Sequence, residues 1–161
     1  MTKLGFIGVG NMGGAILKGI GGKLGNTAVF AFDANKDKLA DLTLLGATAA
    51  GSAREIAEKC DYILLAVKPQ HLGEVLAEIK DSVRPETVFI SICAGISAEY
   101  IRERTIPNAK VVLVMPNTPM MLGCGASAMS HDDKVSEEEF AFARKIIGSC
   151  GITEVVPTDK M

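Results

Sequence analysis

Short aliphatic segments alternate with longer segments of helical periodicity along this chain of 161 residues. Such alternation favours parallel strands joined by helices that cover both faces of the sheet. An aromatic content of only 5% and the lack of Trp fit the aliphatic core that buried parallel strands require. We therefore expect an α/β protein with a doubly wound, mostly parallel sheet. The strands are expected at 4–7, 28–32, 47–50, 62–67, 87–92, 110–115 and 152–156, with a further segment at 126–130.

Helical periodicity predicts helices between these strands, and polar residues mark where some of them begin. Ser52 and Ser97 are suited to cap helix N-termini, and Glu55, three residues after Ser52, completes a capping-box pattern. Pro116 and Pro119 predict an irregular loop, because proline disrupts both helix interiors and β-ladders. The helices are expected at 11–21, 36–45, 53–59, 71–80, 98–104 and 136–147.

The first strand is followed by a glycine-rich turn, which then opens a helix. The turn reads Gly8-Val9-Gly10-Asn11-Met12-Gly13 and fits the pattern G-x-G-x-x-G. In this pattern the first glycine permits a tight turn, the second lets the backbone approach a pyrophosphate, and the third lets helix and strand pack closely. The helix N-terminus adds free N–H groups and a partial positive charge. The turn therefore predicts a Rossmann-type domain that binds a dinucleotide.

Asp33 ends the second strand, 20 residues after Gly13. A carboxylate at this place can accept hydrogen bonds from the ribose hydroxyls of NAD(H) and repel the 2′-phosphate of NADP(H). Asn35, Lys36 and Lys38 follow closely and would offset that repulsion. The interpretation favours NAD(H) and leaves NADP(H) open; the alternative is that Asp33 is an ordinary turn residue.

Charge and composition exclude several classes of function. A net charge of −2 without a long run of one sign argues against nucleic acid or a membrane surface as partner. No apolar stretch approaches the ~20 residues of a membrane span, and no secretory signal precedes the first strand. The four widely separated cysteines are typical of reduced thiols in a cytoplasmic protein. No metal-ligand, Ser-His-Asp or paired-carboxylate pattern occurs, and His71 and His131 lack partner motifs.

Four segments of the chain resemble pyrroline-5-carboxylate reductases, in the order and spacing of that family. The resemblance implies reduction of 1-pyrroline-5-carboxylate to proline, the last step of proline biosynthesis, by hydride transfer from NAD(H) or NADP(H). It implies no metal and no catalytic nucleophile, because a protonated imine is already electrophilic. The segments are Gly5-Phe6-Ile7-Gly8-Val9-Gly10-Asn11-Met12, Ala66-Val67-Lys68-Pro69-Gln70, Ser91-Ile92-Cys93-Ala94-Gly95-Ile96-Ser97 and Val114-Met115-Pro116-Asn117-Thr118-Pro119.

The resemblance also implies which residues form the site. Each of the last three segments begins where a strand ends, and ligands of such sheets bind at the carboxyl ends of the strands. The resemblance implies that Asn117 and Thr118 lie near the nicotinamide and the substrate. Lys68 could instead be an ordinary surface lysine, and Cys93 could instead be a small residue of the core. The implied cofactor-binding residues are Ile7, Gly8, Val9, Gly10, Asn11, Met12, Asp33, Asn35, Ala66, Val67, Lys68, Pro69, Cys93, Ala94, Gly95 and Asn117.

The expected organisation is one dinucleotide-binding domain at 1–156 and the start of a linker at 157–161. In the family a helical domain follows, forms the dimer and completes the substrate pocket; we expect little catalysis without it and a homo-oligomer with it. Two alternatives remain. A 3-hydroxyacid dehydrogenase of the hydroxyisobutyrate or phosphogluconate type begins with a similar glycine run, but has a Gly-Gly segment where this chain has Met115-Pro116-Asn117. The other is a non-catalytic module that senses dinucleotides.

Overall fold

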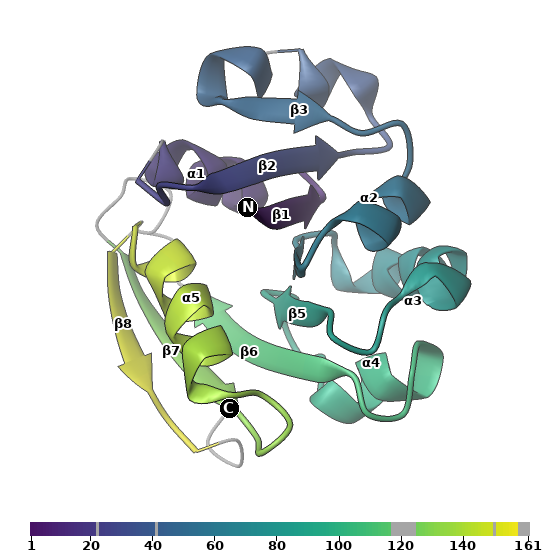
Figure 1. Cartoon of the computed structure of the whole chain (residues 1–161), viewed down its shortest axis with the longest axis vertical. Helices are drawn as coiled ribbons and strands as arrows, with labels where there is room; N and C mark the ends of the chain where they lie inside the picture. Colours follow the sequence, from purple (N-terminus) through teal and green to yellow (C-terminus); the bar gives the residue numbers. More distant parts are fainter. Residues whose placement is uncertain (22, 41, 117–124, 150, 158–161) are drawn as a thin grey trace.

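The computed structural model describes residues 1–161 apart from 22, 41, 117–124, 150 and 158–161. The described residues form one sheet of eight strands in the order β3-β2-β1-β4-β5-β6-β7-β8 (Figure 1). The strands are β1 (Thr2–Ile7), β2 (Thr27–Phe32), β3 (Ala47–Ala49), β4 (Tyr62–Leu65), β5 (Val88–Ser91), β6 (Lys110–Pro116), β7 (Gly125–His131) and β8 (Gly151–Val155).

The sheet is parallel from β3 to β6 and reverses once. Strand β7 runs antiparallel to β6, with Met115 opposite Ala128, and β8 then pairs with β7 in parallel. The strands from β3 to β6 are parallel because the helical connection after each strand returns the chain to the end of the sheet at which that strand began. The expectation of a doubly wound, mostly parallel α/β sheet is confirmed.

Helices cover both faces of this sheet (Figure 1). Leu4 and Phe6 of β1 belong to the core that includes Ile16 of α1 and Phe140 of α5. Ile7 belongs to the opposite core, beneath α2, α3 and α4. This division reflects the alternation of side chains along a strand. The helices are α1 (Asn11–Ile20), α2 (Ala53–Lys59), α3 (Pro69–Ile79), α4 (Ala98–Arg104) and α5 (Glu137–Gly148).

The prediction of one helix at 36–45 is wrong. Two short 3₁₀ helices, η1 (Lys36–Leu39) and η2 (Leu42–Leu45), occupy this segment, and a third, η3 (Lys80–Ser82), follows α3. The Asn35 side chain accepts the N–H of Asp37, and the Ala40 N–H donates to the Asp37 carbonyl three residues back. Such local bonds compete with the α-helical pattern and favour short 3₁₀ turns.

Serine caps begin three of the helices. Ser97 accepts the N–H of Tyr100, and Ser136 forms a reciprocal capping box with Glu139. Ser52 accepts the N–H of Glu55 at 3.1 Å, as expected. The Glu55 carboxylate, however, accepts the N–H of Gly51 at 3.3 Å instead of that of Ser52, so the capping box expected there is only half formed.

Two ion pairs join the segment just after β7 and helix α5 to α4 and β6. Arg102 of α4 lies 2.7 Å from Asp132, and Lys110 of β6 lies 2.7 Å from Glu139 of α5. Desolvation acts to raise the pKa of Glu139, but the Lys110 ammonium and the Ser136 N–H outweigh it and hold that pKa below its ordinary value. Partial burial likewise acts to raise the pKa of Asp132, which the Lys134 N–H and Arg102 hold below its usual value.

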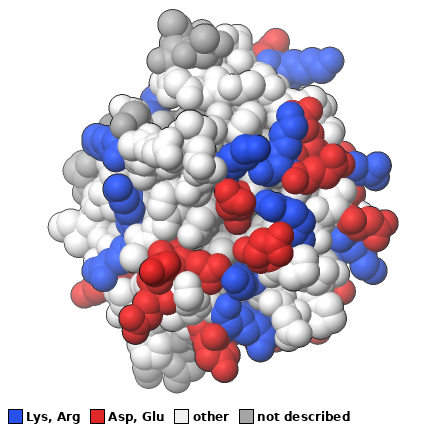
Figure 2. Space-filling model, viewed as in Figure 1, with Lys and Arg blue, Asp and Glu red and all other residues white. Residues whose placement is uncertain are grey.

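Charged side chains of both signs interleave over the face of the molecule shown in Figure 2. This mixed surface accords with the small net charge of −2. Each helix in the described part of the chain is too short or too polar to cross a membrane.

Candidate functional site

The segments expected to form the site meet at the carboxyl ends of the parallel strands. The glycine turn follows β1, Asp33 follows β2, Ala66 follows β4 and Cys93 lies just after β5. Backbone hydrogen bonds hold neighbouring segments together past the strand ends. They run from Gly8 N–H to Phe32 O at 2.8 Å, from Ala66 N–H to Ile7 O at 2.9 Å and from Ile92 N–H to Leu65 O at 3.2 Å. Asn117 and Thr118 lie outside the described residues.

The three glycines of the turn have three different surroundings. Gly8 has φ +101°, and a Cβ added there would lie 2.8 Å from the carbonyl of Ala66. A Cβ on Gly13 would lie 2.5 Å from the Gly8 carbonyl oxygen. At Gly10 an added Cβ would meet no described atom within 4 Å. Gly8 and Gly13 are therefore required by the packing of the chain, whereas the space beside Gly10 is open to a ligand.

The helix N-termini beside this turn differ from the others. Helices α2, α4 and α5 begin at Ser52, Ser97 and Ser136, each of which accepts a backbone N–H. Among the described residues, no side chain caps α1, which begins after Gly10, or α3, which begins after Lys68. The first N–H groups of a helix have no partner within the helix, and together they favour an anion. Helix α1 thus begins without a side-chain cap at Gly10, the residue that has open space beside it.

Asp33 is fixed by the backbone on both sides. One carboxylate oxygen accepts the N–H of Val9 at 2.8 Å, and the other accepts the N–H of Asn35 at 2.8 Å. Each carboxylate oxygen can accept a second hydrogen bond, so Asp33 keeps acceptor capacity. Sequence reasoning missed these two bonds, although an Asp that bonds an N–H two residues on is a known turn pattern.

Asp33 also borders a cavity of about 480 Å³ beyond β2. Lys36 lies on its wall, so one carboxylate and one ammonium border the same space. Asn35, by contrast, begins η1 and accepts the Asp37 N–H with its side chain. The cavity is lined by Phe32, Asp33, Ala34, Lys36, Leu39, Ala40, Ala50 and Gly51.

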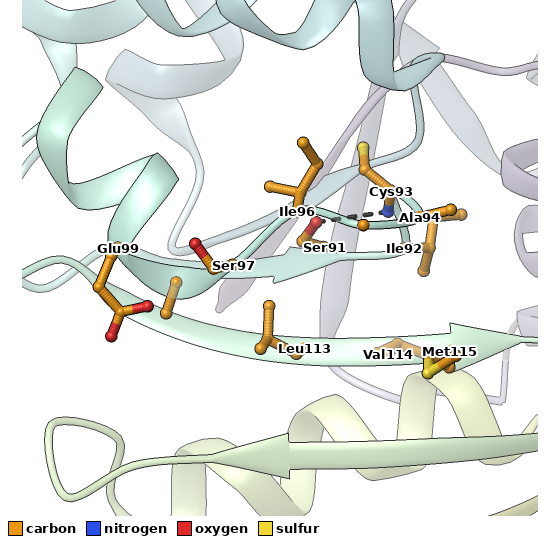
Figure 3. A pocket seen from close by; sticks show the side chains of 12 residues that line it. Ser91, Ile92, Cys93, Ala94, Ile96, Ser97, Glu99, Leu113, Val114 and Met115 are labelled. Atoms are coloured by element: carbon orange, nitrogen blue, oxygen red, sulfur yellow. Dashed lines mark hydrogen bonds between the residues drawn. The ribbon is translucent and has the colours of Figure 1, made fainter. Parts of the chain in front are cut away.

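A second cavity, of about 410 Å³, lies between the segment after β5 and strand β6 (Figure 3). The buried Ser91 hydroxyl accepts the N–H of Cys93 at 3.3 Å, and Ser97 caps α4 at the other end of the segment. Met115 on β6 is 53% exposed and forms part of the wall. The lining residues are Ser91, Ile92, Cys93, Ala94, Gly95, Ile96, Ser97, Ala98, Glu99, Leu113, Val114 and Met115.

The expected site residues are thus spread over the glycine turn, the two cavities and the start of α3. Cys93, Ala94 and Gly95 line the cavity, whereas Lys68 is an exposed residue at the start of α3. Leu113 and Met115 were not among the site residues expected from the sequence. The period-two alternation of β6 would have placed both on one face of the strand, which is the signal that could have found them. Within the described part of the chain, no group of three His, Cys, Asp or Glu side chains is placed to hold a metal ion.

Comparison with curated proteins and solved structures gives relatives over almost the whole chain. Pyrroline-5-carboxylate reductase of Escherichia coli (strain K12) is 34% identical over 157 residues, which are 96% of this chain and 58% of the relative. A pyrroline-5-carboxylate reductase structure from Coxiella burnetii has a TM-score of 0.89 at 26% identity, over 96% of this chain and 58% of the other. The Plasmodium falciparum pyrroline carboxylate reductase, solved with NADP bound, has a TM-score of 0.85 at 32% identity, over 99% and 59%.

This chain thus spans somewhat less than three fifths of the length of each of these relatives. The match to a family model lies within the chain itself. The model described as "NADP oxidoreductase coenzyme F420-dependent" matches residues 3–95, which include the glycine turn, Asp33 and the segment after β5. On this match over more than half of its length, the chain belongs to the family described as "NADP oxidoreductase coenzyme F420-dependent".

Proposed function

We propose that this chain is the dinucleotide-binding half of a pyrroline-5-carboxylate reductase, which reduces 1-pyrroline-5-carboxylate to proline with NADH or NADPH. The observation that carries the proposal is the open space beside Gly10 at the uncapped start of α1, in a chain whose relatives bear that name. The proposed domain spans 1–156, with 157–161 as the start of a linker. A cytoplasmic location and a homo-oligomer of the full-length protein belong to the same proposal.

The described residues fit a dinucleotide in three places. The N-terminus of α1 would bind the pyrophosphate, because no side chain caps it and the space beside its N-cap, Gly10, is open. The cavity beyond β2 would take the adenosine side, since Asp33 and Lys36 border it. The cavity beside β6 would take the nicotinamide and the imine substrate between Ala94 and Met115. Cofactor binding by the segment 66–69 and by Asn117, with Thr118 near the nicotinamide and the substrate, completes this assignment.

When bound, the nicotinamide supplies the hydride that reduces the imine carbon. The chain then has to hold the nicotinamide and the substrate in the correct relative position and to exclude water. Leu113 and Val114 are buried and present aliphatic surface to the second cavity, which suits a reaction that excludes water. The Ser91 hydroxyl offers a polar group on the same wall and would orient a carboxamide or carboxylate.

NADH is the proposed cofactor. Two backbone bonds fix the Asp33 carboxylate, so it cannot turn away from a 2′-phosphate. Its remaining acceptor capacity suits the two ribose hydroxyls of NADH. Lys36 borders the same cavity and reduces the repulsion, so NADPH is expected to bind more weakly and not to be excluded.

Calorimetric titration of the purified chain with NADH and NADPH tests binding directly. Oxidation of NADH in the presence of 1-pyrroline-5-carboxylate, by this chain and by a longer protein that contains it, tests the reaction. We expect micromolar to submillimolar binding of NADH and turnover by the longer protein. Lack of dinucleotide binding by a folded chain would overturn the assignment of the glycine turn, and turnover of a 3-hydroxyacid instead of the imine would overturn the assigned substrate.

A further inference from the structure

The loops at the carboxyl edge are joined by a hydrogen bond from a side chain as well as by backbone bonds. Past the end of β4, the thiol of Cys93 lies 3.3 Å from the carbonyl oxygen of Val67. This contact joins the loop after β5 to the loop after β4, beyond the last backbone bond between them, which is Ile92 N–H to Leu65 O. The Cys93 side chain thus adds one more link between the two loops.

The geometry identifies Val67 as the acceptor of the thiol proton. The Leu65 carbonyl oxygen is farther from the Cys93 sulfur, at 3.6 Å, and already accepts the Ile92 N–H. Burial raises the pKa of the Cys93 thiol, against a smaller opposite effect of Ser91. The thiol therefore stays protonated at neutral pH and can donate a hydrogen bond.

The Val67 segment forms the wall against which the glycine turn is packed. A Cβ on Gly8 would lie 2.8 Å from the Ala66 carbonyl and 2.9 Å from the Val67 nitrogen. Any shift of Val67 would therefore change the space beside the turn. Cys93 also lines the cavity beside β6, and its sulfur points away from β6 (Figure 3). Cys93 thus lies between the turn and the cavity without presenting its sulfur to a ligand.

We propose that Cys93 is a positioning residue, whose thiol holds the Val67 carbonyl and so fixes the segment 66–69 against the glycine turn for dinucleotide binding. The inference rests on the proposed function, because it needs a dinucleotide at this edge. The thiol acts by donating a hydrogen bond and takes part in no bond-making step. Removal of the thiol lowers the affinity for the whole dinucleotide. The affinity for its adenosine part alone, which is assigned to the cavity beyond β2, stays unchanged.

The test compares Cys93→Ala, which removes the donor, with Cys93→Ser, which retains one. Cys60→Ala is the matched control, because Cys60 is a buried thiol of the same apolar core but lies at the opposite end of β4, before Tyr62. NADH and adenosine, which lacks the phosphate assigned to the turn, are titrated calorimetrically against each protein. Infrared difference spectra between the wild type and each alanine variant isolate the S–H stretching band of the residue removed.

We expect Cys93→Ala to bind NADH about five-fold more weakly, which corresponds to about 1 kcal/mol for one hydrogen bond. Adenosine affinity, and NADH affinity in Cys93→Ser and Cys60→Ala, are expected to change by less than about two-fold. The S–H band lost in Cys93→Ala should lie at the frequency of a hydrogen-bonded thiol. Equal NADH affinity of the wild type and Cys93→Ala, an equal loss for adenosine, or a free-thiol band would each overturn this inference alone. A wild type that binds no dinucleotide overturns the proposed function and this inference with it.

Discussion

Replacing Gly10 by alanine separates ligand binding from folding at the glycine turn. Gly10 has φ −79° and ψ −157°, in the extended region that any residue adopts. An added Cβ would meet no described atom within 4 Å, so the protein has room for the methyl group. That room lies beside the free N–H groups of α1, where the pyrophosphate is proposed to bind. The substitution therefore should change binding and leave the fold intact.

The expected magnitudes differ for the two properties. Gly→Ala removes flexibility from the unfolded chain, which stabilises by about 0.4–1 kcal/mol, but Ala is a poorer N-cap than Gly by a similar amount. The free energy of unfolding should thus stay within about 0.5 kcal/mol of the wild type. The methyl group displaces the pyrophosphate from at least one charge-assisted hydrogen bond, worth about 1.5–3 kcal/mol. NADH affinity should fall about 10- to 150-fold.

Gly13→Ala is the matched control, because it adds the same methyl group three residues on. There the Cβ would lie 2.5 Å from the Gly8 carbonyl oxygen, so the turn must shift. We expect a loss of about 1–3 kcal/mol in unfolding free energy, and a clear decrease in Tm. Thermal unfolding and calorimetric titration of both variants make the comparison. NADH affinity within two-fold of the wild type in a fully stable Gly10→Ala protein would refute the argument, because the open space would then hold no phosphate.

Three further results are expected. In titrations the wild type should bind NADH about ten-fold more tightly than NADPH, since a like charge beside the 2′-phosphate is costly, and Asp33→Ser should remove this preference. Tighter NADPH binding by the wild type would contradict this. Glu139→Gln should lower Tm at neutral pH, because the folded pKa of Glu139 lies below its ordinary value of 4.5 and its stabilisation is fully present above that pH. The stabilisation is lost as pH falls through the folded pKa, so the Tm difference between the two proteins should shrink in acid below pH 4.5. The chain alone should be mainly monomeric by light scattering. It should turn over 1-pyrroline-5-carboxylate at under about a thousandth of the rate of a longer reductase, because positioning the substrate against the cofactor is worth several kcal/mol. Full activity from a monomer would show that the whole pocket lies in this chain.

The parallel sheet could be predicted because its signals are local and repeat along the chain. Apolar runs such as Tyr62–Leu65 are buried on both faces and are recognisable by composition alone. Serine caps at Ser52 and Ser97 were visible for the same reason, since the cap and the N–H it accepts are three residues apart. The glycine turn was found because its context, a strand before and a helix after, is also local.

Features that depend on distant or competing contacts were missed. The 36–45 segment has helical spacing, but the Asn35 side chain and the Ala40 N–H favour 3₁₀ turns there. Asp33 was selected for a ligand, and sequence could not show that Val9, 24 residues earlier, already donates to it. The wall that Leu113 and Met115 give to the second cavity depends on how β6 pairs with β5.

Because β7 is antiparallel to β6, helix α5 begins at the amino ends of the parallel strands, whereas the glycine turn lies at their carboxyl ends. The contact of Glu139 with Lys110, the first residue of β6, places that helix start there. Glu137, Glu138 and Glu139 fill the first turn of α5, where negative charge complements the helix dipole. A strand of six residues separates the two edges by roughly 20 Å, more than twice the screening length of about 8 Å at physiological salt. The reversal therefore keeps three carboxylates out of the electric field that would attract a pyrophosphate, whereas a parallel seventh strand would have started the same helix beside it.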